Sequence, residues 1–138
     1  MEWNCQHMFS DGTPGFSGFL DAIAADLEQA EVPAEVASRA MVAFDEIVSN
    51  ILLHGAPGSR PTVTVLLRTG PHALVAEVLD DGAPFDPLTQ DAPDVSLSVE
   101  ERPIGGLGIH LVRKLMDSVE YTHDGTRNRL RFSKTYAI

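Results

Sequence analysis

The order of helical and strand periodicities along the chain predicts an α+β protein, a two-layer α/β sandwich whose mostly antiparallel, mixed sheet carries three helices on one face. In three segments, apolar residues recur at spacings of three and four, which is typical of amphipathic helices. In other segments they alternate with polar residues, which is typical of half-buried strands. The elements follow the order strand, helix, helix, strand, strand, loop, helix, strand, strand.

The first third of the chain is expected to supply one edge strand and two helices. Residues 2–10 suit the strand, and Gly-Thr-Pro-Gly at 12–15 separates it from a helix over 15–31. Pro33 suits the first turn of the second helix, and Gly55 ends that helix. The buried stripe of the second helix is predicted to consist of Val36, Ala40, Phe44, Ile47 and Ile51.

Two hairpins supply the remaining strands. Alternation indicates strands at 62–69 and 73–80, and again around 117–123 and 128–136, where Asp124-Gly125 suits the turn. One face of the 73–80 strand is predicted to consist of Leu74, Ala76 and Val78.

Between the hairpins lies a long segment without a sustained period. Residues 83–104 contain four prolines and several acids, so we expect a loop, and loops of this length in compact domains are usually functional. Gly105-Gly106-Leu107-Gly108 then opens the third helix. The apolar positions of this helix are Ile109, Leu111, Val112, Leu115 and Met116.

Composition and charge restrict the class of protein. A chain of 138 residues with 43% hydrophobic and 22% charged residues suits one globular domain over 1–138 rather than a disordered segment. A formal net charge of -10 repels nucleic acid and anionic membranes, so neither is expected as a partner. The sequence favours the cytoplasm as the location. It has a single cysteine, and it has no apolar stretch that suits a signal peptide or a membrane span.

Glu46, Asn50 and His54 form a polar seam along the second helix. Positions four apart on a helix drift by only about 40°, so these side chains climb one edge beside the buried stripe. Alone, such a seam is typical of a solvated flank, with His54 near the last carbonyl groups before Gly55. A ligand site along the seam is the alternative.

Two further segments carry residues that suit a ligand site. Residues 79–87 read LDDGAPFDP and end a strand in acids and a glycine turn, which by itself is typical of a tight turn with solvated carboxylates. Residues 105–117 read GGLGIHLVRKLMD and place glycines before a helix. Backbone N–H groups can close on an anion there, or a lid can hinge there.

These three segments resemble the nucleotide-binding boxes of the GHKL ATPase and kinase superfamily. Residues 46–54 resemble the N box, E-x-x-x-N-x-x-x-H, residues 80–84 the G1 box, D-x-G-x-G, and residues 105–117 the G2 box. Within the superfamily the chain is most similar to the anti-sigma factor serine kinases, over nearly its whole length and in the right order. The resemblance implies the Bergerat ATP-binding fold, with 87–104 as the ATP lid.

The resemblance assigns roles to the polar seam. It implies that Asn50 coordinates a Mg²⁺ ion that bridges the phosphates of ATP, which suits an amide oxygen as a hard ligand. It implies that Glu46 is the base that accepts the proton of the attacking hydroxyl. His54 matches a nucleotide-site position of the family, and a structural role for it stays open.

The G1 resemblance implies that Asp80 accepts a hydrogen bond from the adenine amino group and that Gly82 lets the base approach. Asp81 fits this role less well, because Ala83 rather than glycine follows it by two residues. Pro84 replaces the second glycine of the box and brings a fixed φ and no N–H. We expect binding to persist, since the adenine contact needs only Asp80 and Gly82.

The remaining candidates are expected around the phosphates and the base. The amides of Gly105, Gly106 and Gly108 suit the negative charge of the phosphates. Arg102 is the only basic residue of the lid and either reaches the terminal phosphate or lies in solvent. Thr126 resembles a late Gly-Thr pair that lies near adenine in the family.

Three arginines alternate along the last strand. Its charged face consists of Arg127, Arg129 and Arg131, and its opposite face of Asn128, Leu130 and Phe132. Such a charged face is ordinarily solvated. With helices on only one side of the sheet, it could instead meet an acidic partner.

The resemblance implies an ATP-dependent serine/threonine protein kinase with ATP and Mg²⁺ as cofactors. Relatives phosphorylate a small anti-sigma factor antagonist protein and sequester a sigma factor, and many are homodimers. The alternative is a nucleotide-dependent binding module that holds its partner without turnover. A sensor histidine kinase or a gyrase-type ATPase would need further domains, for which 138 residues leave no room.

Overall fold

The computed structural model describes residues 3–9, 15–54, 61–89 and 106–137. Within these ranges the chain forms three α-helices, one 3-10 helix and five strands. The helices are α1 (Phe16–Gln29), α2 (Ala34–His54) and α3 (Gly106–Leu115), with the 3-10 helix at Pro87–Thr89. The strands are β1 (Cys5–Phe9), β2 (Val63–Thr69), β3 (Ala73–Asp80), β4 (Ser118–His123) and β5 (Asn128–Thr135).

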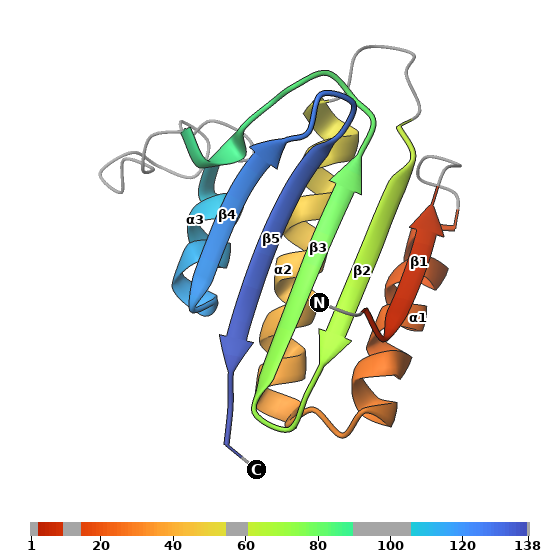
Figure 1. Ribbon diagram of the computed structural model, residues 1–138, viewed down its shortest axis with the longest axis vertical. Coiled ribbons are helices and arrows are strands. Elements are labelled where there is room, and N and C mark those ends of the chain that lie inside the picture. The colour runs from red at the N-terminus through yellow and green to blue at the C-terminus, as the bar shows by residue number, and fades with distance from the viewer. Residues whose placement is uncertain (1–2, 10–14, 55–60, 90–105, 138) are drawn as a thin grey trace.

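The strands form one sheet in the order β1-β2-β3-β5-β4, with the three α-helices on one face (Figure 1). This arrangement confirms the α+β, two-layer architecture and the edge position of the first strand. All four strand pairs are antiparallel, so the prediction of a mixed sheet is wrong for the described strands. The reason is that β3 and β4 run in the same direction but the second hairpin inserts β5 between them.

The ends of the elements follow from local chemistry. Pro33 lies just before α2 rather than within its first turn, and its carbonyl accepts a hydrogen bond from the N of Ala37 at 2.9 Å. The β4–β5 turn contains Asp124-Gly125, as predicted. Gly125 has a φ of 97°, a left-handed conformation that glycine adopts without strain.

The core lies between the helices and one face of the sheet. Phe44 of α2 and Phe132 of β5 are fully buried and meet edge to face, with ring centroids 5.0 Å apart and planes inclined by 64°. In the predicted stripe of α2, Ile51 is only half-buried, and the other four residues are buried. The inward residues of the first hairpin are Val63, Val65, Leu67, Leu74, Ala76 and Val78.

Helix α3 packs on the core through residues three and four apart. Ile109, Val112 and Met116 are buried, whereas Leu111, which the sequence grouped with them, is 38% exposed. Two residues along a helix correspond to about 200°, so Leu111 lies on nearly the opposite side from Ile109.

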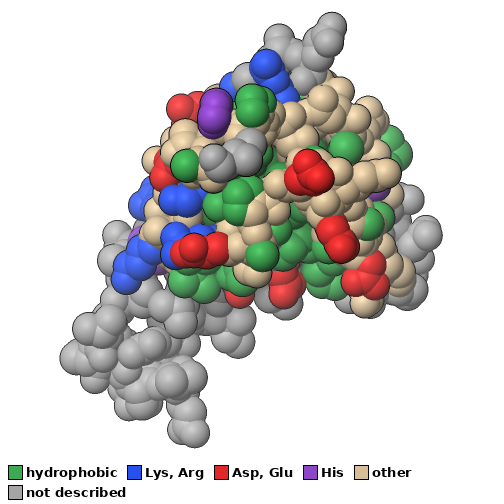
Figure 2. Space-filling view, turned by 90° about the horizontal axis from the view of Figure 1, so that it is seen from below, with side chains coloured by type: hydrophobic (Ala, Val, Ile, Leu, Met, Phe, Trp, Pro, Cys, Tyr) green, Lys and Arg blue, Asp and Glu red, His purple; other side chains and the backbone are tan. Residues whose placement is uncertain are grey.

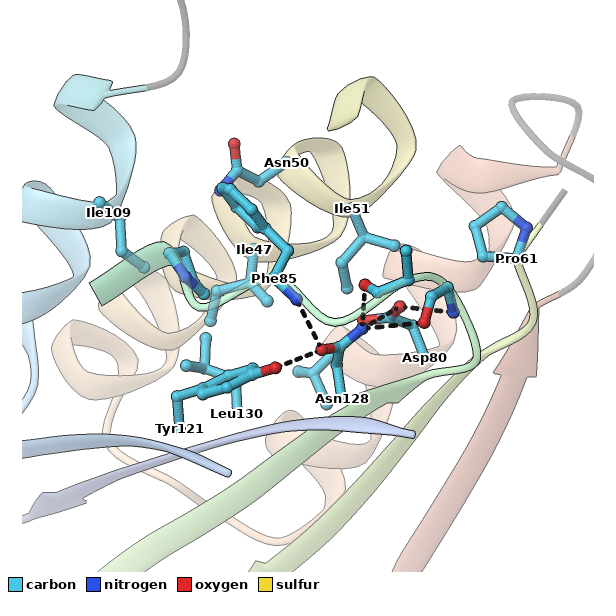
Figure 3. Close-up of a pocket in the computed structure, with 14 residues that line it drawn as sticks. Ile47, Asn50, Ile51, Pro61, Asp80, Phe85, Ile109, Tyr121, Asn128 and Leu130 are labelled. Atoms are coloured by element: carbon cyan, nitrogen blue, oxygen red, sulfur yellow. Dashed lines mark hydrogen bonds between the residues drawn. The ribbon is translucent and has the colours of Figure 1, made fainter. Parts of the chain in front are cut away.

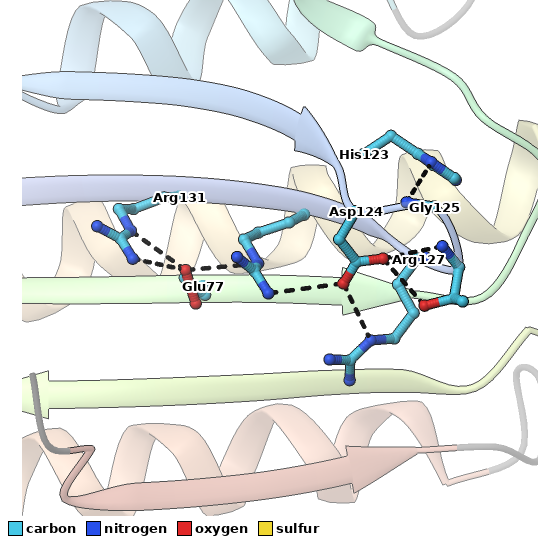
Figure 4. Close-up of polar contacts among 8 residues, drawn as sticks. Glu77, His123, Asp124, Gly125, Arg127 and Arg131 are labelled. Atoms are coloured by element: carbon cyan, nitrogen blue, oxygen red, sulfur yellow. Dashed lines mark hydrogen bonds and ion pairs between the residues drawn. The ribbon is translucent and has the colours of Figure 1, made fainter.

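The face of the sheet without helices carries an ion cluster (Figure 4). Arg131 lies opposite Glu77 in the β3–β5 register and donates from Nε and Nη2 to its Oε1, at 3.2 and 2.7 Å. Arg129 places Nε 3.7 Å from the same oxygen and Nη2 3.6 Å from Oδ2 of Asp124. The predicted arginine face is confirmed for Arg129 and Arg131, whereas Arg127 lies in the turn before β5. All three guanidinium groups already meet carboxylates of the same chain, because Nε of Arg127 lies 3.8 Å from Oδ2 of Asp124.

Charged side chains are unevenly distributed over the surface. Figure 2 shows basic side chains at the left and top of the view, whereas carboxylates occur on both halves. On the left, the basic side chains lie among carboxylates, so this side offers no uniformly basic surface of the kind that nucleic acid requires. Among the described helices, none combines the length and the apolar character needed to cross a bilayer.

Phe44→Ala should lower the free energy of unfolding by about 3–5 kcal/mol, because it removes a fully buried ring and leaves a void against Phe132. Urea unfolding followed by circular dichroism measures the change. Leu111→Ala is the matched control, because it truncates an exposed side chain and should change stability by no more than about 0.5 kcal/mol. A loss below about 1 kcal/mol for Phe44→Ala would contradict the described packing.

Candidate functional site

A cavity opens beside the end of β3, between the sheet and helices α2 and α3 (Figure 3). It encloses about 590 Å³, its open mouth included. Most of its wall is apolar, and its polar groups gather where β3 and β5 meet. The lining residues are Ile47, Asn50, Ile51, Pro61, Val78, Asp80, Gly82, Ala83, Phe85, Pro87, Ile109, Tyr121, Asn128 and Leu130.

Asp80, the last residue of β3, forms the acidic floor of the cavity and is 7% exposed. Its Oδ1 accepts hydrogen bonds from the N of Gly82 at 3.0 Å and from Nδ2 of Asn128 at 3.1 Å. Burial raises the pKa of Asp80 above its ordinary value, and these two hydrogen bonds oppose the rise. Among the described residues both donors reach Oδ1, which leaves Oδ2 as an acceptor for a ligand.

Asn128, the first residue of β5, is 6% exposed and connects the polar groups of the floor (Figure 3). Its Nδ2 also donates to the carbonyl of Ala83 at 2.9 Å. Its Oδ1 accepts from the N of Phe85 at 3.1 Å and from the hydroxyl of Tyr121. Because a backbone N–H can only donate, Oδ1 must face Phe85, and the orientation of the amide is fixed.

Three of the predicted site residues come together at this cavity. Asn50, Asp80 and Gly82 line it, although they belong to α2, the end of β3 and the turn that follows. Asn50 is half-buried and lies at the rim in Figure 3, across the opening from Asp80. The roles that the sequence suggested for them stay predictions.

Glu46 does not line the cavity; its carboxylate lies against α3. A Cβ atom on Gly108 would lie only 2.2 Å from Oε2 of Glu46, so glycine at this position leaves room for the carboxylate. Gly108 is the third residue of α3, close to the positive end of the helix dipole. The predicted base and one predicted glycine of the phosphate site are therefore in direct contact.

Thr126 and Asp81 make hydrogen bonds outside the cavity. Thr126 does not line the cavity; it is exposed in the β4–β5 turn, where its N and Oγ1 donate to Oδ1 of Asp124 at 2.9 and 3.0 Å. The backbone N–H groups of Thr126 and Arg127, with the Thr126 hydroxyl, hold the pKa of Asp124 well below its usual range. Asp81 accepts a hydrogen bond from the N of Thr62 at 2.8 Å.

The other predicted site residues are only partly described. Arg102, Gly105 and residues 90–104 of the predicted lid lie outside the described residues, and so does the side chain of His54 at the end of α2. Helix α3 begins at Gly106, so the glycine run opens this helix as predicted.

A comparison with known protein families identifies the chain. A sequence profile described as the histidine kinase-like ATPase domain matches residues 17–134. The chain belongs to this family. The match confirms the resemblance that the three boxes suggested.

Two curated relatives of this histidine kinase-like ATPase domain are named as kinases. The serine/threonine-protein kinase BtrW of Bordetella bronchiseptica is 29% identical over 87 residues, which cover 62% of this chain and 61% of that protein. The serine-protein kinase RsbW of Bacillus cereus is 30% identical over 87 residues, which cover 60% of this chain and 54% of that protein. The chain therefore spans less than two thirds of the length of these relatives.

A solved structure, the histidine kinase AdeS of Acinetobacter baumannii, is similar with a TM-score of 0.49 and 9% identity. The similarity covers 98% of this chain and 68% of that chain.

The ATPase family implies a nucleotide, which is generally accompanied by Mg²⁺, and one described side chain of the cavity suits such an ion. Mg²⁺ takes oxygen ligands, usually keeps several waters and needs few protein ligands. Asn50 offers an amide oxygen at the rim of the cavity. Within the described ranges, no group of three His, Cys, Asp or Glu side chains is arranged to hold a metal.

Asn128 and Tyr121 line the cavity but were not predicted from the sequence as residues of the site. Asn128 was expected on the same face of the last strand as Leu130 and Phe132, with no role of its own. A polar residue on an otherwise apolar inward face was the available signal, because a buried amide needs hydrogen-bond partners. Tyr121 gave no comparable signal, since a half-buried tyrosine on a strand is common.

Asp80→Asn should raise the thermal midpoint of the nucleotide-free domain at neutral pH. The pKa of Asp80 is higher in the folded state than in the unfolded state, so the folded state loses stability as the pH rises from the unfolded pKa through the folded pKa. Asparagine is neutral at every pH and does not suffer this loss. The gain should be absent below about pH 3.9, where an ordinary aspartate is protonated.

Scanning calorimetry between about pH 3.5 and pH 8 measures the gain from Asp80→Asn. Asp45→Asn, on the exposed side of α2, is the matched control. A gain of equal size at every pH would contradict the role of the buried charge.

Proposed function

We propose that this domain binds Mg·ATP in the cavity and transfers the γ-phosphoryl group to a serine or threonine of a partner protein. The partner is a small anti-sigma factor antagonist, and the same chain sequesters a sigma factor in the cytoplasm, as a homodimer. The observation that carries this function is the cavity, in which a buried carboxylate acceptor, apolar walls and the Asn50 amide come together in a relative of serine kinases.

The inner end of the cavity suits a purine base. The faces of the base would contact Ile47, Val78 and Leu130, and burial of apolar surface stabilises binding by roughly 25 cal/mol per Å². An amino group on the base supplies the donor that Oδ2 of Asp80 requires. Gly82 has no side chain that would obstruct this contact.

The rim of the cavity suits the phosphates. Ile109 of α3 lines the cavity, so the N-terminal turn of this helix lies close to it. The first N–H groups of a helix have no intrahelical acceptor, and the helix dipole favours an anion there. Asn50 would hold Mg²⁺, and the ion would neutralise charge on the phosphates.

Glu46 is the residue that we assign as the base. The hydroxyl oxygen of the partner forms a bond to the γ-phosphorus, the bond from this phosphorus to the bridging oxygen breaks, and ADP leaves. Glu46 takes the hydroxyl proton. Its carboxylate lies beside Gly108 in the first turn of α3 and one turn before Asn50 on α2, next to the proposed phosphate region.

A non-catalytic module that binds a partner in response to nucleotide is the second candidate function. One observation favours it: Glu46, the assigned base, does not line the cavity, so the proposed contacts to the purine do not involve it. Kinase and binding module would then share the same nucleotide contacts and differ only in turnover.

Incubation of the purified protein with Mg²⁺, γ-labelled ATP and a purified anti-sigma factor antagonist protein distinguishes these functions. The kinase leaves labelled phosphate on a serine or threonine of the antagonist. An antagonist that stays unlabelled although ATP binds would identify the binding module. Absence of ATP binding in calorimetry would overturn both functions.

Glu46→Gln should lower phosphoryl transfer by about 10²–10⁴-fold, because the amide cannot accept the proton. The affinity for ATP should stay within about threefold, or about 0.65 kcal/mol, since Glu46 does not line the cavity and the base pocket is unchanged. Single-turnover transfer and calorimetry measure the two quantities. Unchanged transfer would show that another group takes the proton.

Gly108→Ala should also lower transfer, because its Cβ atom would displace the carboxylate of Glu46. The free energy of unfolding should change by less than about 1 kcal/mol, since the end of the Glu46 side chain can swing away and alanine favours the helix. Gly18→Ala is the matched control, because a Cβ atom there meets nothing within 4 Å. Full activity of Gly108→Ala would contradict the importance of the Glu46 position.

A further inference from the structure

Asn128 takes part in most of the hydrogen bonds on the cavity floor, and the function proposed above gives it no role. We propose that Asn128 is a positioning residue that makes the cavity select a purine with an amino group at C6. It does so by holding Oδ1 of Asp80 and leaving Oδ2 as the acceptor for the ligand. This inference rests on the proposed nucleotide site and deepens it.

The amide of Asn128 cannot exchange its two ends without loss. In the observed orientation Nδ2 donates to Oδ1 of Asp80 and to the carbonyl of Ala83, at 3.1 and 2.9 Å. A flipped amide would place its oxygen against these two oxygens and its NH₂ against the N–H of Phe85. Every one of these contacts would then be repulsive in a buried site, so Asn128 always presents a donor to Asp80.

The turn after β3 depends on the same amide. Pro84 has no N–H, so the next backbone donor along the chain is the N of Phe85, and Oδ1 of Asn128 accepts its hydrogen bond at 3.1 Å. The carbonyl of Gly82 also accepts from Nδ2, at 3.3 Å. Asn128 therefore keeps the turn in the conformation in which the N of Gly82 reaches Oδ1 of Asp80.

With Oδ1 engaged by two donors, the ionised Asp80 can only accept hydrogen bonds through Oδ2. A 6-aminopurine offers an N–H donor at this position. A 6-oxopurine in the same pose offers a carbonyl oxygen, which would face the carboxylate without a proton between them. A site that leaves a buried polar group unpaired rejects the wrong ligand strongly, so adenine is selected over hypoxanthine.

The selection requires Asp80 to stay ionised in a buried place. Burial raises the pKa of Asp80, and the hydrogen bond from Asn128 is the first of the contacts that lower it. A protonated carboxyl group could donate to a 6-oxo group, and selectivity would be lost. Asn128 thus protects the acceptor state of Asp80.

Few other groups act on Asp80. Asp81 follows it and raises its pKa, whereas His123 on β4 lowers it. Tyr121, also on β4, donates to Asn128 rather than to Asp80. The lining residues from α2 and α3 do not titrate, and they are Ile47, Asn50, Ile51 and Ile109.

Calorimetric titration with ATP and with inosine triphosphate, both with Mg²⁺, tests this inference. The unmodified protein should bind ATP at least about tenfold more tightly, as expected for one hydrogen bond at a charged group. Asn128→Asp has the same shape but offers Asp80 a second carboxylate in place of a donor. It should bring the two affinities within about threefold of each other, mainly through weaker ATP binding.

The pH profile separates this role from a merely structural one. ATP affinity of the unmodified protein should fall as the pH falls through the pKa of Asp80. The fall should occur at a higher pH in Asn128→Asp, because loss of the donor and gain of a carboxylate both raise that pKa. Asn4→Asp, which adds the same charge outside the cavity, should leave selectivity and profile unchanged.

Thermal melts establish whether each variant is folded, and Asn128→Ala, which also lacks the donor, replaces Asn128→Asp if the latter does not fold. The unmodified protein already decides one arm: equal binding of both nucleotides overturns the inference. If the unmodified protein prefers ATP and the Asn128 variant shows the same preference and the same pH profile, the inference is overturned. The proposed function is then left intact. Binding of neither nucleotide by the unmodified protein overturns both.

Discussion

The site depends on one constraint, the fixed orientation of α2 about its own axis, which decides which of its side chains face the sheet. Phe44 is fully buried and meets Phe132 edge to face, so the inner stripe of the helix is held against the sheet. Every other side chain of α2 then takes its direction from the helical repeat. Asn50 reaches the cavity, and Glu46 reaches the first turn of α3. Core packing therefore sets the direction in which both polar side chains leave the helix.

The cavity floor shows how the fold tolerates a charge in a buried place. An isolated carboxylate is costly away from water, and Asp80 is kept there by hydrogen bonds from Gly82 and Asn128. Among the described residues these bonds reach only Oδ1, so Oδ2 can accept a hydrogen bond from a ligand. Stability without ligand is lower than an apolar floor would give, which is the usual cost of a binding site.

Sequence patterns predicted most of the fold because the periodicities are long and consistent. The stripe of α2 and both hairpins follow from local spacing, and the motif spacing brought attention to Asp80. Strand order is not a local property, and the expectation of a mixed sheet was wrong for this reason. Asn128 was missed because its meaning depends on the β3–β5 register, which places it directly opposite Asp80 although 48 positions separate them in the chain.

The net charge of -10 means that a polyanionic ligand must bind against the overall field of the protein. The arginines of β5 do not relieve this, because Arg129 and Arg131 lie on the other face of the sheet, close to Glu77. In the proposed function, affinity then comes from the apolar walls and Asp80 at the base end, while N–H groups of α3 and a cation would meet the charge at the rim. This separation of base contacts from phosphate contacts suits a kinase. The contacts to the base stay the same during transfer, whereas the contacts to the phosphates can be stronger in the transition state than in the ground state.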